Sequence, residues 1–105
     1  MTLEEIAEIL KETGLPVTYM AWPERQAPHL PYICYLSPYS NNFSADGIVY
    51  QGISHINIEL YTKVKSPALE STVENVLSQN NIFWEKSEEY LSDQRCFEII
   101  YEIEV

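Results

Sequence analysis

Two segments of the sequence alternate apolar and polar residues with a period of two, and they restrict the fold more than any other feature. The first covers residues 53–62 and the second covers residues 97–105. Their apolar positions are Ile56, Ile58 and Leu60 in the first segment and Phe97, Ile99, Tyr101, Ile103 and Val105 in the second. Because successive side chains of a β-strand point to opposite faces, both segments are predicted to be strands with one buried face.

Two other segments have helical periodicity and helix-capping residues. Thr2 and Glu5 form a capping box at the start of the first helix, which Gly14 ends. Ser66 caps the second helix, with Pro67 in its first turn, where a missing N–H costs nothing. The apolar stripes of the two helices are Leu3, Ile6, Ala7 and Leu10, and Leu69, Val73, Val76 and Leu77.

Three further segments, 17–22, 32–37 and 83–91, are rich in β-branched and aromatic residues or alternate in part, which predicts strands. The element order is then α-β-β-β-α-β-β. Adjacent strands with short turns favour an antiparallel sheet with helices on one face. The predicted fold class is α+β, with a mainly antiparallel sheet of about five strands flanked by two helices. A chain of 105 residues without a shift in composition is expected to form a single domain over 1–105.

Two connections differ from ordinary short turns. Pro23, Pro28 and Pro31 fix the backbone and remove donors, so this segment is predicted to be an ordered loop. The segment 38–52 contains many turn-forming residues together with aromatic and apolar ones. Because a long connection in a compact domain is usually functional or mobile, we predict a protruding hairpin arm that packs on another surface, such as a second subunit.

The charge of the chain excludes some classes of partner. Sixteen Asp and Glu residues against six Lys and Arg residues give a formal net charge of −10. Such a surface is repelled by phosphate backbones and by anionic membranes, so direct binding to nucleic acid or to a membrane is not expected. Two interpretations of the charge stay open: it provides solubility, or it forms an acidic face that avoids DNA or meets a basic partner.

The two cysteines, Cys34 and Cys96, are interpreted as buried small apolar residues. A secreted domain of this size usually carries more cysteines, arranged in disulfides. The N-terminal residues lack a basic start and an apolar core, so no signal peptide is expected, and no apolar run is long enough for a membrane span. We therefore expect a reducing, intracellular compartment.

Few residues suggest catalysis. His29 and His55 have no second histidine or cysteine at metal-ligand spacing. Cys34 with His55 is a conceivable thiolate pair, but the simpler interpretation is a buried thiol and an edge histidine. Glu98, Glu102 and Glu104 share one face of a predicted strand, where a solvated surface is simpler than acid–base chemistry. We expect no catalytic residues, no metal and no cofactor, and we expect a protein that is not an enzyme.

Several stretches of the chain resemble small tail proteins of long-tailed bacteriophages and prophages of Gram-positive bacteria. In the first third these are Leu15, Pro16, Val17, Thr18 and Tyr19, then Pro23, Ala27 and Pro28, then Leu30, Pro31, Tyr32 and Ile33. The others are Asn41, Asn42, Phe43, Ala45, Asp46 and Gly47, then Ile58, Glu59, Leu60, Tyr61 and Thr62, then Ile82, Phe83 and Trp84, and finally Tyr101, Glu102 and Ile103. The resemblance covers most of the chain, and its motifs are structural.

The resemblance implies a structural role in the virion, as a tail-terminator, tail-completion or minor tail subunit. Such proteins form rings, often of six subunits, and contact other tail or head–tail connector proteins. The expected locations are the bacterial cytoplasm during assembly and then the virion tail. Residues expected at a subunit interface are Tyr39, Asn42, Phe43, Asp46 and Tyr50. The alternative is a stand-alone acidic protein-binding or inhibitor domain.

Overall fold

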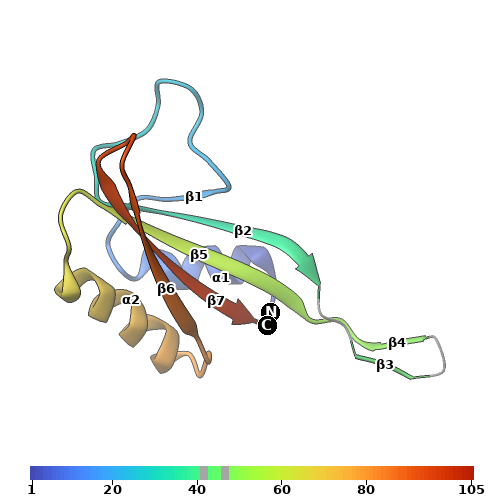
Figure 1. Cartoon of the computed structure of the whole chain (residues 1–105). Helices are drawn as coiled ribbons and strands as arrows, with labels where there is room; N and C mark the ends of the chain where they lie inside the picture. Colours follow the sequence, from blue (N-terminus) through green and yellow to red (C-terminus); the bar gives the residue numbers. More distant parts are fainter. Residues whose placement is uncertain (41–42, 46–47) are drawn as a thin grey trace.

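The computed structural model describes residues 1–40, 43–45 and 48–105, with the backbone alone for 43–45 and 48–51. The elements in chain order are α1 (Leu3–Lys11), β1 (Val17–Tyr19), β2 (Tyr32–Ser40), β3 (Phe43–Ala45), β4 (Ile48–Gln51), β5 (Ser54–Thr62), α2 (Pro67–Gln79), β6 (Glu85–Leu91) and β7 (Cys96–Glu104) (Figure 1).

Five strands form one sheet in the order β1-β2-β5-β7-β6. The pair β1–β2 is parallel, and the pairs β2–β5, β5–β7 and β6–β7 are antiparallel. The predicted fold class, α+β with a mainly antiparallel sheet of about five strands and two helices, is confirmed. The short strands β3 and β4 pair with each other in a second, two-stranded sheet, which adds a hairpin to the predicted order.

Several strand boundaries differ from the predicted ones. Strand β6 begins at Glu85 instead of residue 83, β5 begins one residue later than predicted, and β7 begins and ends one residue earlier. Strand β1 ends at Tyr19 instead of residue 22, because Met20 adopts a positive φ of 62°. Strand β2 continues to Ser40, three residues beyond the predicted end, through an irregularity between Leu36 and Tyr39. Pro38 lies in that irregularity, where its missing N–H does not interrupt a regular ladder.

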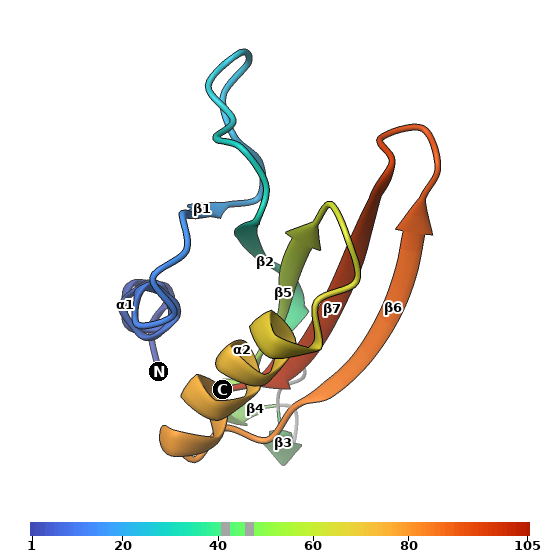
Figure 2. The ribbon, with the colours of Figure 1, turned by 90° about the vertical axis from the view of Figure 1, so that its left-hand side faces the viewer.

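The core lies on one face of the five-stranded sheet. Both helices cover that face and leave the other uncovered by secondary structure (Figure 2). The alternation in β5 and β7 explains the arrangement, because their registered pairs Ile56↔Ile103, Ile58↔Tyr101 and Leu60↔Ile99 all point toward the helices. The helices contribute the buried residues Ile6, Ile9, Leu10, Val73, Val76 and Leu77.

The helix starts are those expected from the sequence. The Thr2 hydroxyl accepts a hydrogen bond from the Glu5 N–H, and the Glu5 carboxylate accepts one from the Thr2 N–H, both at 3.1 Å. The Ser66 hydroxyl accepts one from the Leu69 N–H at 3.3 Å, with Pro67 as the first helical residue. These caps fix where each helix begins above the sheet.

An ion-pair network joins α2 to the edge strand β6. The buried Glu70 carboxylate lies 2.6 Å from the Lys65 Nζ and 3.1 Å from the Lys86 Nζ. Lys86 Nζ also lies 2.7 Å from Glu74, whose carboxylate accepts a hydrogen bond from the buried Tyr101 hydroxyl at 2.8 Å. Burial by itself would raise the pKa of Glu70, but the hydrogen bonds and charges of the two lysines outweigh it, so the pKa lies below its usual value.

We expect Glu70→Gln to lower the free energy of unfolding by about 1–2 kcal/mol at neutral pH, a value discounted because both lysines are partly exposed. A lowered carboxyl pKa stabilises the fold above the unfolded pKa and loses this effect as the pH falls. In urea denaturation, the difference in free energy of unfolding between the wild type and the variant should therefore disappear as the pH falls from about 5 to about 3. If the difference in free energy of unfolding were the same at neutral pH and at about pH 3, the charge of Glu70 would not contribute to stability. The exposed Glu12→Gln serves as the control.

Candidate functional site

The face of the sheet opposite the helices, here called the open face, carries most of the polar side chains of the strands. Its residues on the three inner strands include Tyr32, Cys34, Leu36, His55, Asn57, Glu59, Tyr61, Cys96, Glu98, Ile100, Glu102 and Glu104. The edge strand β6 adds Glu85, Ser87, Glu89 and Leu91. Six of these residues are glutamates and none is a lysine or arginine, so the open face is strongly acidic over the described strands.

One tyrosine joins two of these glutamates across the centre of the open face. The Tyr61 hydroxyl lies 2.7 Å from Glu98 Oε2 and 3.0 Å from Glu59 Oε1. Glu98 is the registered partner of Tyr61 on β7, and Glu59 lies two residues before it on β5, so alternation places all three on one face. The Tyr32 ring packs beside Tyr61 at 5.4 Å, and Trp22 packs on Tyr32 at 5.8 Å, so aromatic rings border one side of the cluster.

This cluster contains more acceptor oxygens than the phenol can satisfy. A phenol has one hydrogen to donate, and the shorter contact indicates that Glu98 receives it. Glu59 Oε1, at 3.0 Å, is a second acceptor for the same hydroxyl hydrogen. Burial raises the pKa of Glu59, the Tyr61 hydrogen bond lowers it in part, and the Glu98 charge raises it further. Burial and the two carboxylates also raise the pKa of Tyr61, which keeps the phenol protonated.

The interpretation of His55 as an edge histidine is wrong. It lies on the expected polar face, but β5 is the central strand of the sheet, and His55 is only 6% exposed. Its ring stacks on Tyr39 with centroids 4.4 Å apart and an interplanar angle of 9°. Its Nε2 lies 3.0 Å from Asn57 Oδ1 and 3.3 Å from Glu102 Oε1, and its Nδ1 lies 3.7 Å from Glu104 Oε1.

A pocket of about 460 Å³ lies beside His55, where β5 begins and β7 ends. Its lining residues are His55, Phe83, Glu85, Glu102, Ile103 and Glu104. Sequence periodicity does not predict this site, because His55, Glu85 and Glu104 meet only through the strand order β5-β7-β6. The alternation of residues predicts that Glu102 and Glu104 share one face, but it does not predict which residues of other strands lie beside them.

The five residues predicted at a subunit interface lie in and beside the arm. Tyr39 is 56% exposed and lies near the end of β2, where it contacts His55. Phe43 belongs to β3 and Tyr50 belongs to β4, and only the backbone of these strands is described. Phe43 pairs with Gln51 and Ser44 pairs with Val49, so Tyr50 has no registered partner on β3. Asn42 and Asp46 lie outside the described residues.

The conceivable thiolate pair is not assembled. Cys34 pairs with Glu59 in the register of β2 and β5, four residues along β5 from His55, or about 13 Å. Burial, with the charges of Glu59 and Glu98, raises the pKa of the Cys34 thiol to about 11, which opposes a thiolate. Both cysteines are free and buried, as the sequence predicted. His29 lies in the exposed loop between β1 and β2.

Two other features are absent from the described part of the chain. No group of three or more histidine, cysteine, aspartate or glutamate side chains is arranged to hold a metal ion. Neither of the helices over residues 1–40, 43–45 and 48–105 has the length and apolar character needed to cross a membrane. The open face, with its tyrosine cluster and its pocket, is the candidate site.

Comparisons with known proteins leave the family open: no family model matches this chain, and a search of curated proteins found no match.

We expect Glu59→Gln to preserve or raise the free energy of unfolding at neutral pH, by up to about 1 kcal/mol, because an amide can donate to the Tyr61 oxygen without adding charge beside Glu98. A raised carboxyl pKa stabilises the fold below the unfolded pKa and loses this effect as the pH rises through the folded pKa. The advantage of the variant should thus be larger at about pH 7 than at about pH 4 in urea denaturation. An equal loss of stability at about pH 7 and about pH 4 would contradict a raised pKa of Glu59.

Proposed function

We propose that this chain is a structural subunit of a bacteriophage or prophage tail assembly, of the tail-terminator or tail-completion type, which acts through protein–protein contacts. The observation that carries the proposal is the hairpin β3–β4, which extends from the body of an α+β domain as a sheet of its own (Figure 1). The sequence resemblance to small tail proteins supports the same role. A role of this kind would place the protein in the bacterial cytoplasm during assembly and then in the virion tail.

The arm is the surface best suited to a neighbouring subunit. Its strands pair only with each other among the described residues, and a two-stranded hairpin by itself is marginally stable in water. Its sequence nevertheless contains Phe43, Ile48, Val49 and Tyr50, which are strand-forming apolar and aromatic residues. A subunit or tail protein that packs on the hairpin would stabilise it by adding contacts to these residues.

The charge supports an assembly that surrounds DNA without binding it. The net charge is −10, and the open face carries six of the sixteen acidic residues. Like charges repel along a channel, so a ring that turned such a face toward its lumen would let DNA pass without adhering. Partners would be further copies of the chain and other tail or head–tail connector proteins.

The same acidic face favours one alternative. A stand-alone domain with this surface could bind a basic protein and inhibit it, as a mimic of the charge of DNA. That role needs no self-association and no contact with a tail. It is distinguished from the tail role by the partner that is captured and by the oligomeric state.

We expect the chain to associate in a concentration-dependent manner or to co-elute with purified tail tubes in size exclusion with light scattering. Phe43→Ala should weaken this association because it removes an aromatic side chain from the arm, and a well-packed aromatic at an interface contributes on the order of 2 kcal/mol. Tyr90→Ala is the matched control, since Tyr90 is an exposed aromatic on the edge strand β6, outside the arm.

Two outcomes would count against the proposal. If the chain stays monomeric at every concentration and does not bind tail tubes, the result would favour the acidic binding domain. Capture of a basic nuclease or repressor would strengthen that conclusion. If Phe43→Ala and Tyr90→Ala weakened the association equally, the arm would not be the specific contact.

A further inference from the structure

The strands of the domain differ sharply in charge. None of β1, β2, β3 and β4 contains an aspartate, glutamate, lysine or arginine residue, whereas the edge strand β6 contains Glu85, Lys86, Glu88 and Glu89. Because the net charge is −10, two copies of the chain repel each other wherever their acidic surfaces meet. Two uncharged surfaces can approach without this repulsion, so a contact between copies is favoured where uncharged strands reach the surface.

Strand β1 is the uncharged edge of the five-stranded sheet. The Pro16 carbonyl accepts a hydrogen bond from β2 at 2.8 Å, and the Met20 N–H donates one to β2 at 2.7 Å. Since the backbone groups of successive strand residues point to opposite sides, the N–H and C=O groups of Val17 and Tyr19 point away from β2. The Ala21 N–H donates to the Tyr19 carbonyl at 2.7 Å. Three groups then have no partner among the described residues: both of Val17 and the Tyr19 N–H.

The rest of this edge is closed. Strand β2 continues beyond β1, but there the Ser37 N–H donates to the Tyr19 hydroxyl at 3.3 Å, and Pro38 has no N–H to donate. The free backbone is therefore limited to β1, which has three residues. Two apolar side chains lie at its end, Tyr19 with 41% and Met20 with 59% of their surface exposed. A strand that adds to this edge has to be short and uncharged.

The arm contains strands of that kind. Strand β3 has three residues and β4 has four, and among the described residues they pair only with each other, so each has one side without a partner. Strand β4 is the longer, and its Ile48, Val49 and Tyr50 are residue types that favour strands. An extended segment that adds to a sheet edge gains main-chain hydrogen bonds along its free side. Strand β4 therefore fits the free edge of β1 in length, in charge and in backbone chemistry.

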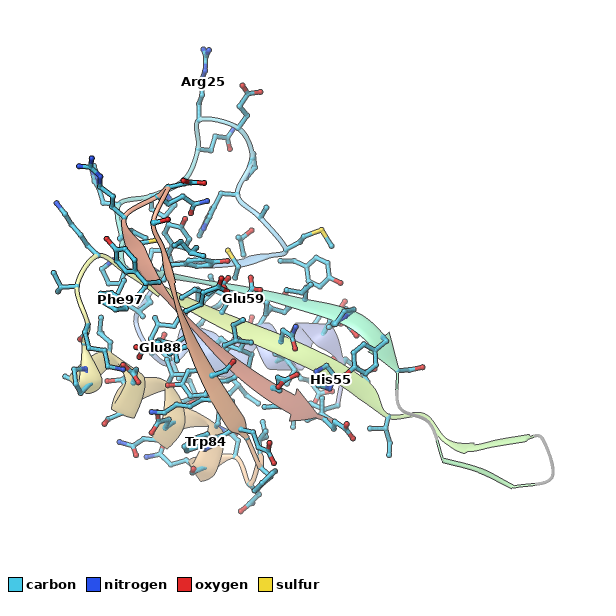
Figure 3. All side chains as sticks on the ribbon, viewed as in Figure 1. Arg25, His55, Glu59, Trp84, Glu88 and Phe97 are labelled. Carbon is cyan, nitrogen blue, oxygen red and sulfur yellow. The ribbon has the colours of Figure 1, made fainter. Side chains whose placement is uncertain are left out.

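The arm of a molecule cannot reach its own β1. Tyr19 at the end of β1 pairs with Tyr35, and β2 continues for five more residues, or about 17 Å, to Ser40 before the arm begins. From there the arm extends away from the body of the domain (Figure 1). The loop that follows β1 also leads away from the sheet, with Arg25 projecting outward (Figure 3). A strand that pairs with β1 has to come from another copy.

We propose that β4 of one copy adds to the free edge of β1 in the next copy, so that the sheet of one subunit continues into the arm of its neighbour. Because two different surfaces meet, the contact is head-to-tail, the type that generates a ring or an open filament. This inference rests on the proposed role as a self-assembling subunit, and it names the surface on which the arm packs.

The test mixes two variants, each of which lacks one half of the contact. Thr18→Lys on β1 and Val49→Lys on β4 each place an ammonium group on an uncharged strand, where a charged side chain opposes strand addition. Each variant alone should raise the apparent dissociation constant of self-association about tenfold or more in sedimentation across a concentration series. Mixed in equal amounts, the two should form a dimer and nothing larger, because one intact arm then meets one intact edge. Ser87→Lys makes the same charge change on the opposite edge strand β6 and should have little effect.

Hydrogen exchange of the wild type supplies a second readout, which does not depend on the folding of any variant. The amides of Val17 and Tyr19 should exchange about tenfold more slowly at high than at low protein concentration, because β4 of a neighbour would then accept their hydrogen bonds. The Met20 amide already donates to β2 and should exchange at the same rate in both samples. NMR resolves the three amides separately.

The outcomes separate this inference from the proposed function. Self-association of Thr18→Lys at wild-type strength, or unchanged exchange of the Val17 and Tyr19 amides in an assembled wild type, would overturn strand addition at β1 and leave the tail role standing. Two variants that circular dichroism shows to be folded, but that stay monomeric when mixed, would also overturn it. A wild-type chain that binds tail tubes only as single copies would have the same meaning, whereas one that neither self-associates nor binds tubes would overturn both proposals. A dimer in the mixture would support the contact, since a purely structural effect of either substitution would not be reversed by mixing.

Discussion

The register between β5 and β7 is the constraint on which the rest of the structure depends. It pairs Ile58 with Tyr101 and Leu60 with Ile99 on the side of the helices, and Asn57 with Glu102 on the other. A slip of one residue would turn every apolar side chain of one strand toward the open face. The buried Tyr101 extends this constraint to α2, because its hydroxyl reaches Glu74, and Glu74 in turn binds Lys86 of β6. One strand pair therefore positions the helix and the edge strand that pack around it.

The same register concentrates charge on the open face. Once the apolar side chains are committed to the core, the intervening glutamates of β5, β6 and β7 lie on one surface with no helix over them. Two neutral or basic side chains lie among these carboxylates: the Tyr61 hydroxyl is between Glu59 and Glu98, and the imidazole of His55 is beside Glu102 and Glu104. The second arrangement leaves an anionic pocket, and Glu85 adds further negative charge to it.

Most of the fold could be predicted because its determinants are local. The capping box at Thr2, the Ser66–Pro67 helix start and the alternation in β5 and β7 each depend on residues a few positions apart. The end of β1 was not predicted, because it depends on the positive φ of Met20, and no glycine at that position indicates such a backbone conformation. The tyrosine cluster and the pocket were missed because Tyr61 and Glu98, or His55 and Glu85, are brought together only by strand order. Periodicity assigns a residue to a face but does not identify its neighbour on another strand.

Charge also limits how copies of this chain can meet. Two open faces repel each other, and the opposite face is already filled by α1 and α2. Side-by-side addition at β6 is opposed by Glu85, Lys86, Glu88 and Glu89, since a charged edge strand resists pairing. The surfaces left are the edge formed by β1 and β2, the two ends of the sheet, and the arm that extends from one of those ends. If the arm contacts a different surface of the next copy, the contact is head-to-tail, and the angle between the two copies decides whether the assembly closes into a ring.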